Sequence, residues 1–161
     1  MLNELIYRAL ISANIPATRE PRGMMRSDDK RPDGVTMVPW AGGKCLVWDA
    51  TVPDTLAPSH FHATAIRAGA AAEKAASAKT TKYSSILSSH HFIPVAIETF
   101  GAYCLQARQF VSDLGRRLAV ASGNPREVTF LRQRLSIAVQ RGNTIAVLGT
   151  LRESGGILFN T

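Results

Sequence analysis

The chain has 161 residues, 45% of them apolar, and its 19 Lys and Arg residues outnumber 12 Asp and Glu residues to give a net charge of +7. This length fits one domain with a sizeable hydrophobic core, and the apolar fraction excludes wholesale disorder. The positive charge favours a polyanionic partner, nucleic acid above all, over a basic surface that binds nothing.

The first predicted element is a short amphipathic helix over residues 3–13. Four apolar residues share one face of this helix: Leu5, Ile6, Ala9 and Leu10. A short strand is expected over residues 17–21. Residues 22–32 are polar and charged, which is typical of a loop.

A β-hairpin is predicted next. One strand covers residues 35–39, the turn covers residues 41–43, and an apolar, β-rich run over residues 45–52 suits a buried central strand. The charged Asp49 inside this run is anomalous, because burying a carboxylate without a partner is costly. We therefore expect a cation or strong hydrogen-bond donors beside Asp49.

The second half of the chain predicts one strand and three helices. An alanine-rich helix covers about residues 59–88, a core strand follows over residues 92–99, and two further helices cover about residues 102–121 and 126–148. Pro94 within the strand indicates an edge position or a bulge.

The order of these elements predicts the fold class. It indicates an α/β domain with a small central mixed β-sheet flanked by helices, formed by residues 1–150. Residues 151–161 are rich in glycine, and we expect them to form a flexible C-terminal tail.

The cysteines and the lengths of the apolar segments indicate the cellular compartment. Cys45 and Cys104 show no metal-type spacing, so we expect free thiols in a reducing compartment rather than a disulfide. The chain shows no signal-peptide core and no run of about 20 uninterrupted apolar residues. We expect an intracellular protein, acting in the nucleus, without a membrane partner.

The hairpin would place two carboxylates side by side. Asp33 stands at its mouth and Asp49 lies on its second strand. Taken alone, Pro32-Asp33-Gly34 is ordinary turn chemistry. Two adjacent carboxylates, however, can hold a hard divalent cation such as Mg²⁺, which can activate water for phosphodiester hydrolysis. We therefore predict a metal site at Asp33 and Asp49.

Basic residues supply candidate phosphate contacts. Lys79 and Lys82 share one helix face, next to Tyr83, and could sit over a scissile phosphate. The alternative is a solvated basic face. The same two alternatives hold for a candidate DNA-backbone track along the last helix, formed by Arg126, Arg132, Arg134 and Arg141. Arg31 is a further candidate DNA contact.

Other ionisable residues are weaker candidates. Glu73, two turns before the lysines, is a candidate further metal ligand. Glu98 ends a predicted core strand, and we favour a structural role for it, as a cap of the following helix. The four histidines do not predict a zinc site, because His60 and His62 would point to different faces and no third ligand has suitable spacing.

Three segments carry a resemblance to a known family: Lys30-Arg31-Pro32-Asp33, Val47-Trp48-Asp49-Ala50-Thr51-Val52 and Lys79-Thr80-Thr81-Lys82-Tyr83. In their order and spacing they resemble the restriction-like endonuclease domain of non-LTR retrotransposons, which is similar to the PD-(D/E)XK nucleases. In those elements the domain follows a reverse transcriptase and nicks target DNA, and the exposed 3′ end primes reverse transcription. The resemblance implies a restriction-endonuclease-like fold, Mg²⁺ or Mn²⁺ as cofactor, DNA as substrate and a reverse transcriptase domain as partner.

By this resemblance, Asp33 and Asp49 are the metal ligands, Lys79 and Lys82 are the catalytic lysines, and Tyr83 supports them. The family carries a basic residue followed by Pro and Asp before its first acid, and Arg31-Pro32-Asp33 matches this motif. The site residues are thus expected to come from a loop, a strand and a helix.

Thr51 departs from the wider superfamily, in which a lysine normally stands two residues after the second acid. A lysine from the adjacent helix would then replace it, orienting the attacking water or stabilising charge on the phosphate. Glu4 on the first helix is a further candidate, since some of these nucleases carry an acid there.

Three hypotheses follow. The leading one is a Mg²⁺-dependent DNA endonuclease. The second, motivated by Thr51, is a catalytically inactive DNA-binding module with the same fold. The third is a structural or assembly domain, in which the carboxylates of Asp33 and Asp49 would lie more than about 8 Å apart, too far for one cation.

Overall fold

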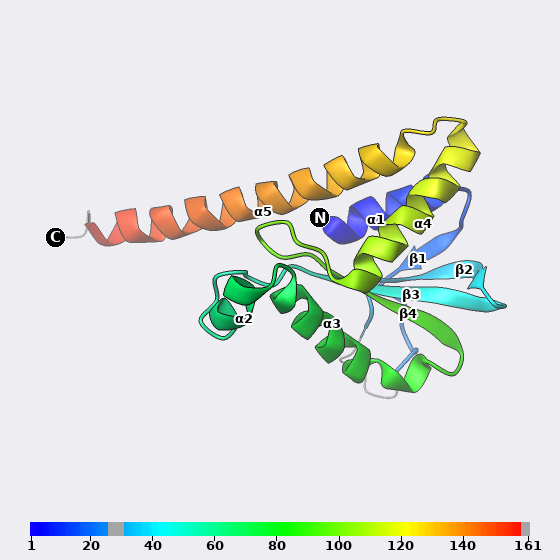
Figure 1. Cartoon of the computed structure of the whole chain (residues 1–161), viewed down its shortest axis with the longest axis horizontal. Coiled ribbons are helices and arrows are strands. Elements are labelled where there is room, and N and C mark those ends of the chain that lie inside the picture. Colours follow the sequence, from blue (N-terminus) through cyan, green and yellow to red (C-terminus); the bar gives the residue numbers. More distant parts are fainter. Residues whose placement is uncertain (26–30, 159–161) are drawn as a thin grey trace.

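The computed structural model describes residues 1–25 and 31–158, without the side chains of Phe61 and residues 153–158. In the described residues the chain is a mixed α/β domain with a four-stranded mixed sheet and five α-helices (Figure 1). The strands lie in the order β1 (Ala17–Arg19), β2 (Gly34–Ala41), β3 (Lys44–Thr51) and β4 (His90–Ala96).

The pairs β1–β2 and β2–β3 are antiparallel, whereas β3 and β4 are parallel. The hairpin predicted from the turn residues is confirmed, and β4 is an edge strand, as Pro94 indicated. The α-helices, together with one 3₁₀ turn, are α1 (Leu2–Ser12), α2 (Phe61–Ile66), α3 (Ala70–Lys82), η1 (Ser84–Ile86), α4 (Leu105–Ser122) and α5 (Glu127–Leu158).

Successive residues of β3 point to opposite faces of the sheet. Leu46 and Trp48 belong to the larger core, which includes residues of α1, α4 and α5 and two alanines of α3. Val47 belongs to a smaller cluster with Tyr83 and Phe92 on the other face, where α3 ends. Asp49 shares the face of Val47, so this alternation alone directs its side chain toward α3.

The register of β2 against β3 depends on Gly34. It pairs with Trp48, and a Cβ at Gly34 would lie 2.1 Å from the Trp48 ring, so no larger residue fits without a shift. The residue before it, Asp33, donates its backbone N–H to the carbonyl of Trp48 at 3.0 Å. This close approach of the two strands fixes the position of Asp33 beside β3.

The prediction of a single helix over residues 59–88 is wrong. The segment forms two helices and a 3₁₀ turn, and the break between α2 and α3 falls at Gly69, whose φ is 87°. Glycine adopts this left-handed conformation at little cost, whereas the alanines around it favour continued helix. The sequence pattern alone does not show that the break is used.

The last helix is longer than the sequence pattern predicts. Its predicted end was residue 148, but α5 continues to Leu158, and residues 159–161 of the expected tail lie outside the described residues. Each glycine in a helix costs only about 1 kcal/mol relative to alanine, so glycines alone do not end it. The outer half of α5 projects from the domain (Figure 1).

The projecting part of α5 carries exposed apolar side chains, among them Ile145, Val147, Leu148 and Leu151. No helix in the described part of the chain is both long enough and apolar enough to cross a membrane.

Candidate functional site

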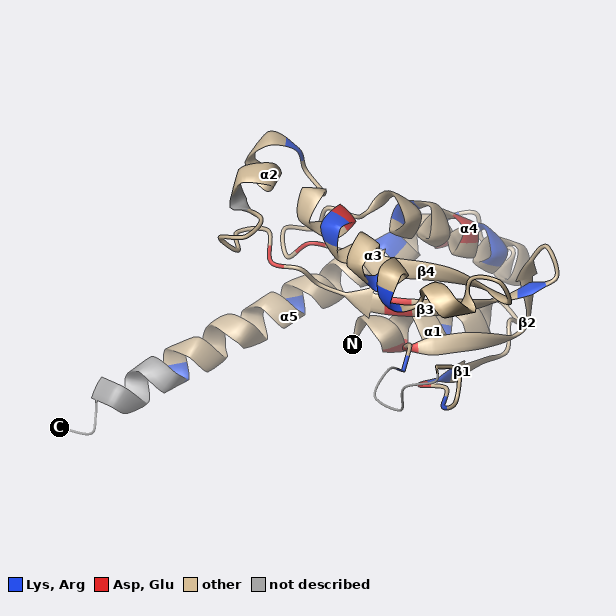
Figure 2. Cartoon of the chain, turned by 90° about the horizontal axis from the view of Figure 1, so that it is seen from below, with Lys and Arg blue, Asp and Glu red and all other residues tan. Residues whose placement is uncertain are grey.

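Asp49 is buried in the middle of β3, with only 4% of the residue exposed. The Lys79 ammonium of α3 lies 2.8 Å from its Oδ2 atom. The cation expected beside this carboxylate is therefore present, and α3 supplies it. In Figure 2, basic segments of α3 lie against an acidic segment of β3.

Asp33 lies beside Asp49, just before β2. Its Oδ2 atom accepts a 2.6 Å hydrogen bond from the backbone N–H of Ala50, the residue after Asp49. The hairpin thus brings the two carboxylates to one place, as the sequence predicted.

Asp33 and Asp49 influence each other's charge. Burial, together with the negative charge of Asp49, raises the pKa of Asp33 to about 6, against the opposing effects of the Ala50 N–H and Lys79. Burial also raises the pKa of Tyr83 to about 12, with Asp49 and then Asp33 adding to the rise. Two carboxylates, one ammonium and one phenol therefore form a single cluster.

Tyr83 joins the end of α3 to the segment that carries Asp33. Its ring is fully buried, 5.0 Å from that of Phe92, and its hydroxyl donates to the backbone carbonyl of Arg31 at 2.9 Å. The Lys82 ammonium lies 5.1 Å from the centre of the Tyr83 ring. Lys82 is therefore close to the cluster, but its ammonium contacts the ring of Tyr83 and forms no ion pair with Asp33 or Asp49 in the described residues.

Two glutamates hold α3 in place rather than joining the acidic pair. Glu98 is 1% exposed, and its Oε1 accepts from the first N–H groups of α3, at Ala71 (2.9 Å) and Ala72 (3.2 Å). The structural role expected for Glu98 is confirmed, but it caps the preceding helix, α3, not the following one. Glu73 accepts from the Leu105 N–H at the start of α4, at 2.6 Å, so it is not a third acid of the cluster.

The first helix contributes an amide instead of an acid. Glu4 forms ion pairs with Arg8, at 2.8 Å, and with Arg19. Asn3 approaches Asp33: its Nδ2 donates to the Asp33 carbonyl at 3.4 Å, and its Oδ1 accepts from Trp48 Nε1 at 3.0 Å. No motif contains Asn3, and nothing in the sequence pattern distinguishes it from other polar residues of the helix.

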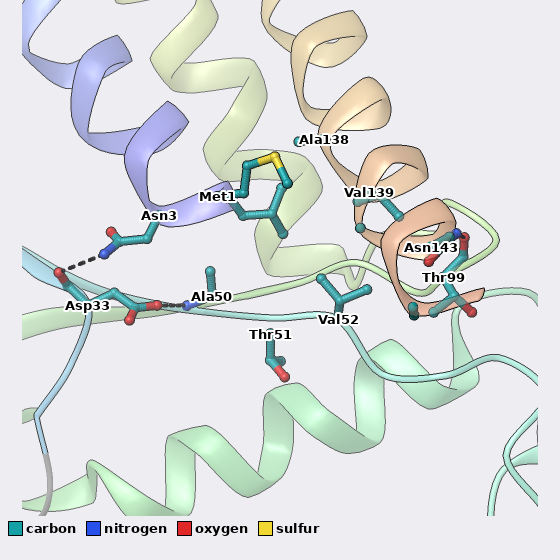
Figure 3. A pocket seen from close by; sticks show the side chains of 13 residues that line it. Met1, Asn3, Asp33, Ala50, Thr51, Val52, Thr99, Ala138, Val139 and Asn143 are labelled. Carbon is teal, nitrogen blue, oxygen red and sulfur yellow. Dashed lines mark hydrogen bonds between the residues drawn. The ribbon is translucent and has the colours of Figure 1, made fainter. Parts of the chain in front are cut away.

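A cavity of about 530 Å³ opens beside Asp33, between the start of α1, the end of β3 and the middle of α5 (Figure 3). Asp33 points toward Ala50 on its wall, whereas Thr51 points away from it toward the ribbon of α3 (Figure 3). The remaining wall is mainly apolar and includes Met1, Val52, Ala138, Val139 and Ala146.

The candidate DNA-binding arginines do not gather at the cluster. Arg132 donates to Ser112 of α4 at 2.7 Å, and Arg134 lies 3.9 Å from Glu127 on its own helix. Because α5 packs on α1 and α4, these arginines lie across the sheet from α3. Arg126 precedes α5, and Arg141 lines a hollow beside Met1. Arg31, in contrast, is exposed two residues before Asp33.

The acidic pair could hold one divalent cation. In the described residues no group of three or more His, Cys, Asp and Glu side chains is placed to bind a metal. Mg²⁺ is commonly bound by one or two carboxylates and keeps several waters, so two suffice. Among the described residues Asp49 Oδ2 accepts no hydrogen bond, and Lys79 holds it by charge. A buried carboxylate oxygen of this kind fits a metal ligand.

No protein-family model matches the chain, and no curated protein sequence matches it. The resemblance to retroelement endonucleases therefore rests on the three short segments, and each of them contributes a side chain to this cluster.

Proposed function

We propose that this chain is a metal-dependent DNA endonuclease domain with a restriction-endonuclease-like fold, which nicks target DNA by phosphodiester hydrolysis. Asp33 and Asp49 are its ligands for Mg²⁺ or Mn²⁺. The observation that carries the proposal is the meeting of Asp33, the buried Asp49 and Lys79, which come from three segments far apart in the sequence.

The cost of this arrangement supports a functional role. Two neighbouring carboxylates repel each other, and burial penalises the charged form of each. The raised pKa of Asp33, about 6, is the measure of that cost. A purely structural role would be served as well by a neutral pair, whereas a divalent cation requires both negative charges.

Each residue of the cluster has a distinct task in this proposal. A bound divalent cation supplies a Lewis acid for the phosphate and lowers the pKa of water. Asp33 and Asp49 hold it, and Lys79 stabilises negative charge on the phosphate. Tyr83 acts as a positioning residue, because it binds the Arg31 carbonyl and so holds the segment before Asp33 against α3.

The positive charge of the chain, +7, supports DNA as the substrate. In this proposal Arg31, which is exposed beside the cluster, and Lys82, which lies at Tyr83, contact DNA phosphates. The resemblance adds that the nick would serve retroelement integration, with a reverse transcriptase domain as partner.

The test is nicking of supercoiled plasmid with and without Mg²⁺ or Mn²⁺, by the wild type and by Asp49→Asn. We expect metal-dependent nicking that falls more than about 100-fold in the variant, because even outer-shell partners of a metal are worth about 10- to 100-fold. Asp113→Asn removes a half-exposed carboxylate on α4, which is paired with Arg116 away from the cluster, and serves as the matched control. Equal nicking by Asp49→Asn and the wild type would contradict the proposal.

One observation favours a second function, a DNA-binding module without nuclease activity. Thr51 stands two residues after Asp49, where the wider superfamily carries its lysine. This function predicts salt-dependent DNA binding without nicking in either metal. The position of Lys79 at Asp49 favours the endonuclease.

A further inference from the structure

The Asp49 carboxylate is held by a cation that the chain itself supplies. Asp49 is 4% exposed, and its Oδ2 atom accepts no hydrogen bond from any residue that the structure describes. The Lys79 ammonium, 2.8 Å away, is the group that offsets its charge. This oxygen is also one that a metal bound between Asp33 and Asp49 would use.

Lys79 is held at its base by the helix, and its side chain is partly exposed. Its helix, α3, is fixed at the start by Glu98, which accepts from two N–H groups there, and at the end by the hydroxyl of Tyr83. The Lys79 side chain is itself 28% exposed, so its ammonium has a path to solvent. A lysine stem has four flexible carbons and lets the charge move several ångströms without any change in the helix.

We propose that Lys79 and the divalent cation compete for Asp49: the ammonium occupies the carboxylate in the metal-free protein, and metal binding releases it toward the DNA phosphate. The inference rests on the proposed function, because it assumes that Asp33 and Asp49 bind the metal.

In this proposal the two cations exclude each other at Asp49 Oδ2. Mg²⁺ binds oxygen at about 2.0–2.1 Å and keeps several of its waters, so it needs the space around Oδ2 that the ammonium fills. Two positive groups on one buried oxygen would also repel each other strongly. The exchange spares the protein an uncompensated buried carboxylate before the metal arrives, a state that is strongly destabilising.

The proposal has a consequence opposite to that of a lysine that contacts only phosphate. Removing Lys79 takes away the competitor, so the metal should bind more tightly, even though nicking should be lost. Loss of a positive charge anywhere on the chain also favours cation binding weakly. Lys74→Met measures that general effect, because Lys74 is an exposed lysine of the same helix.

The experiment is a titration with Mn²⁺ at pH 8, followed by the electron paramagnetic resonance signal of the free ion. For Lys79→Met we expect a Kd about tenfold lower than for Lys74→Met, equivalent to about 1.4 kcal/mol. Lys79→Arg keeps the charge and should bind Mn²⁺ like the wild type. Asp49→Asn should lose most of the binding, and circular dichroism checks that each variant is folded.

A Kd of Lys79→Met equal to or higher than that of Lys74→Met would overturn the competition. If the wild type then binds Mn²⁺ and Asp49→Asn does not, the proposed metal site is still supported. Binding by neither the wild type nor Lys79→Met would overturn both this inference and the proposed function.

A second measurement uses the wild type and needs no Lys79 variant to fold. The ¹⁵N chemical shift of Lys79 Nζ, followed as Mg²⁺ is added, should move to the value of a solvated lysine, with Lys74 as internal reference. A shift that stays unchanged at saturating Mg²⁺ would contradict the release of Lys79.

Discussion

The two faces of β3 show how one strand serves two purposes. Trp48 points to the face under α1, α4 and α5, where it is completely buried among apolar side chains. Its neighbour Asp49 points to the face under α3 and is nearly as buried, but with a lysine as its partner. Burial on the first face stabilises the fold, whereas burial beside the second face raises the pKa of Asp33, the neighbour of Asp49.

The largest expected effect breaks the apolar face. Trp48→Ala should lower the free energy of unfolding by about 3–5 kcal/mol, because it leaves a large cavity in the core and removes the partner of Gly34. Urea denaturation measures this loss. Met37→Ala, at an exposed position of β2, should change stability little. A loss under about 1 kcal/mol in Trp48→Ala would show that this face does not dominate folding.

A smaller change in the free energy of unfolding, an increase, is expected when the charge of Asp33 beside α3 is removed. Burial raises the pKa of Asp33 from 3.8 to about 6, so between these pH values the folded protein binds more protons than the unfolded chain. The free energy of unfolding therefore falls as the pH rises. This contribution is fully present below about pH 3.8 and is lost as the pH rises through about 6.

Asp33→Asn should remove that loss. Above pH 6 we expect the variant to be more stable than the wild type by about 1 kcal/mol, a figure discounted because the half-exposed carboxyl retains part of its hydration. Thermal unfolding of both proteins at pH 4 and pH 8 measures the difference, with Asp113→Asn as control. A variant less stable than the wild type at pH 8 would show that Asp33 is not under electrostatic strain.

The smallest effect concerns DNA contacts on the two faces. Arg31→Ala should weaken DNA binding a few-fold and reduce the salt dependence by about one phosphate contact, because Arg31 flanks the acidic pair. The carbonyl that Tyr83 binds is kept in this variant. Arg132→Ala, across the sheet, should leave binding unchanged. Filter binding at several salt concentrations compares them, and a larger effect of Arg132→Ala would move the DNA to the α5 face.

Local patterns predicted much of the fold. The first helix, the hairpin and the buried central strand follow from apolar periodicity and from the Ala41-Gly42-Gly43 turn, and the structure confirms each of them. The break at Gly69 was missed because the flanking alanines favour helix, and its use depends on packing that the sequence pattern does not carry.

The candidate site was predictable where one anomalous residue marked it. A carboxylate in an apolar strand is costly without a partner, and this reasoning led from Asp49 to a cation beside it. The contacts of Asn3, Glu73 and Glu98 were not predictable, because each crosses from one element to another far along the chain. The sequence around these polar residues gives no sign of such partners.

The central claim is that Asp33 and Asp49 together hold a divalent cation. The most direct measurement is anomalous diffraction from crystals grown with Mn²⁺, for the wild type and for Asp49→Asn. We predict one peak within about 2.5 Å of both carboxylates in the wild type, and none in the variant. A wild-type crystal without that peak at saturating Mn²⁺, or a peak that persists in Asp49→Asn, would contradict the account.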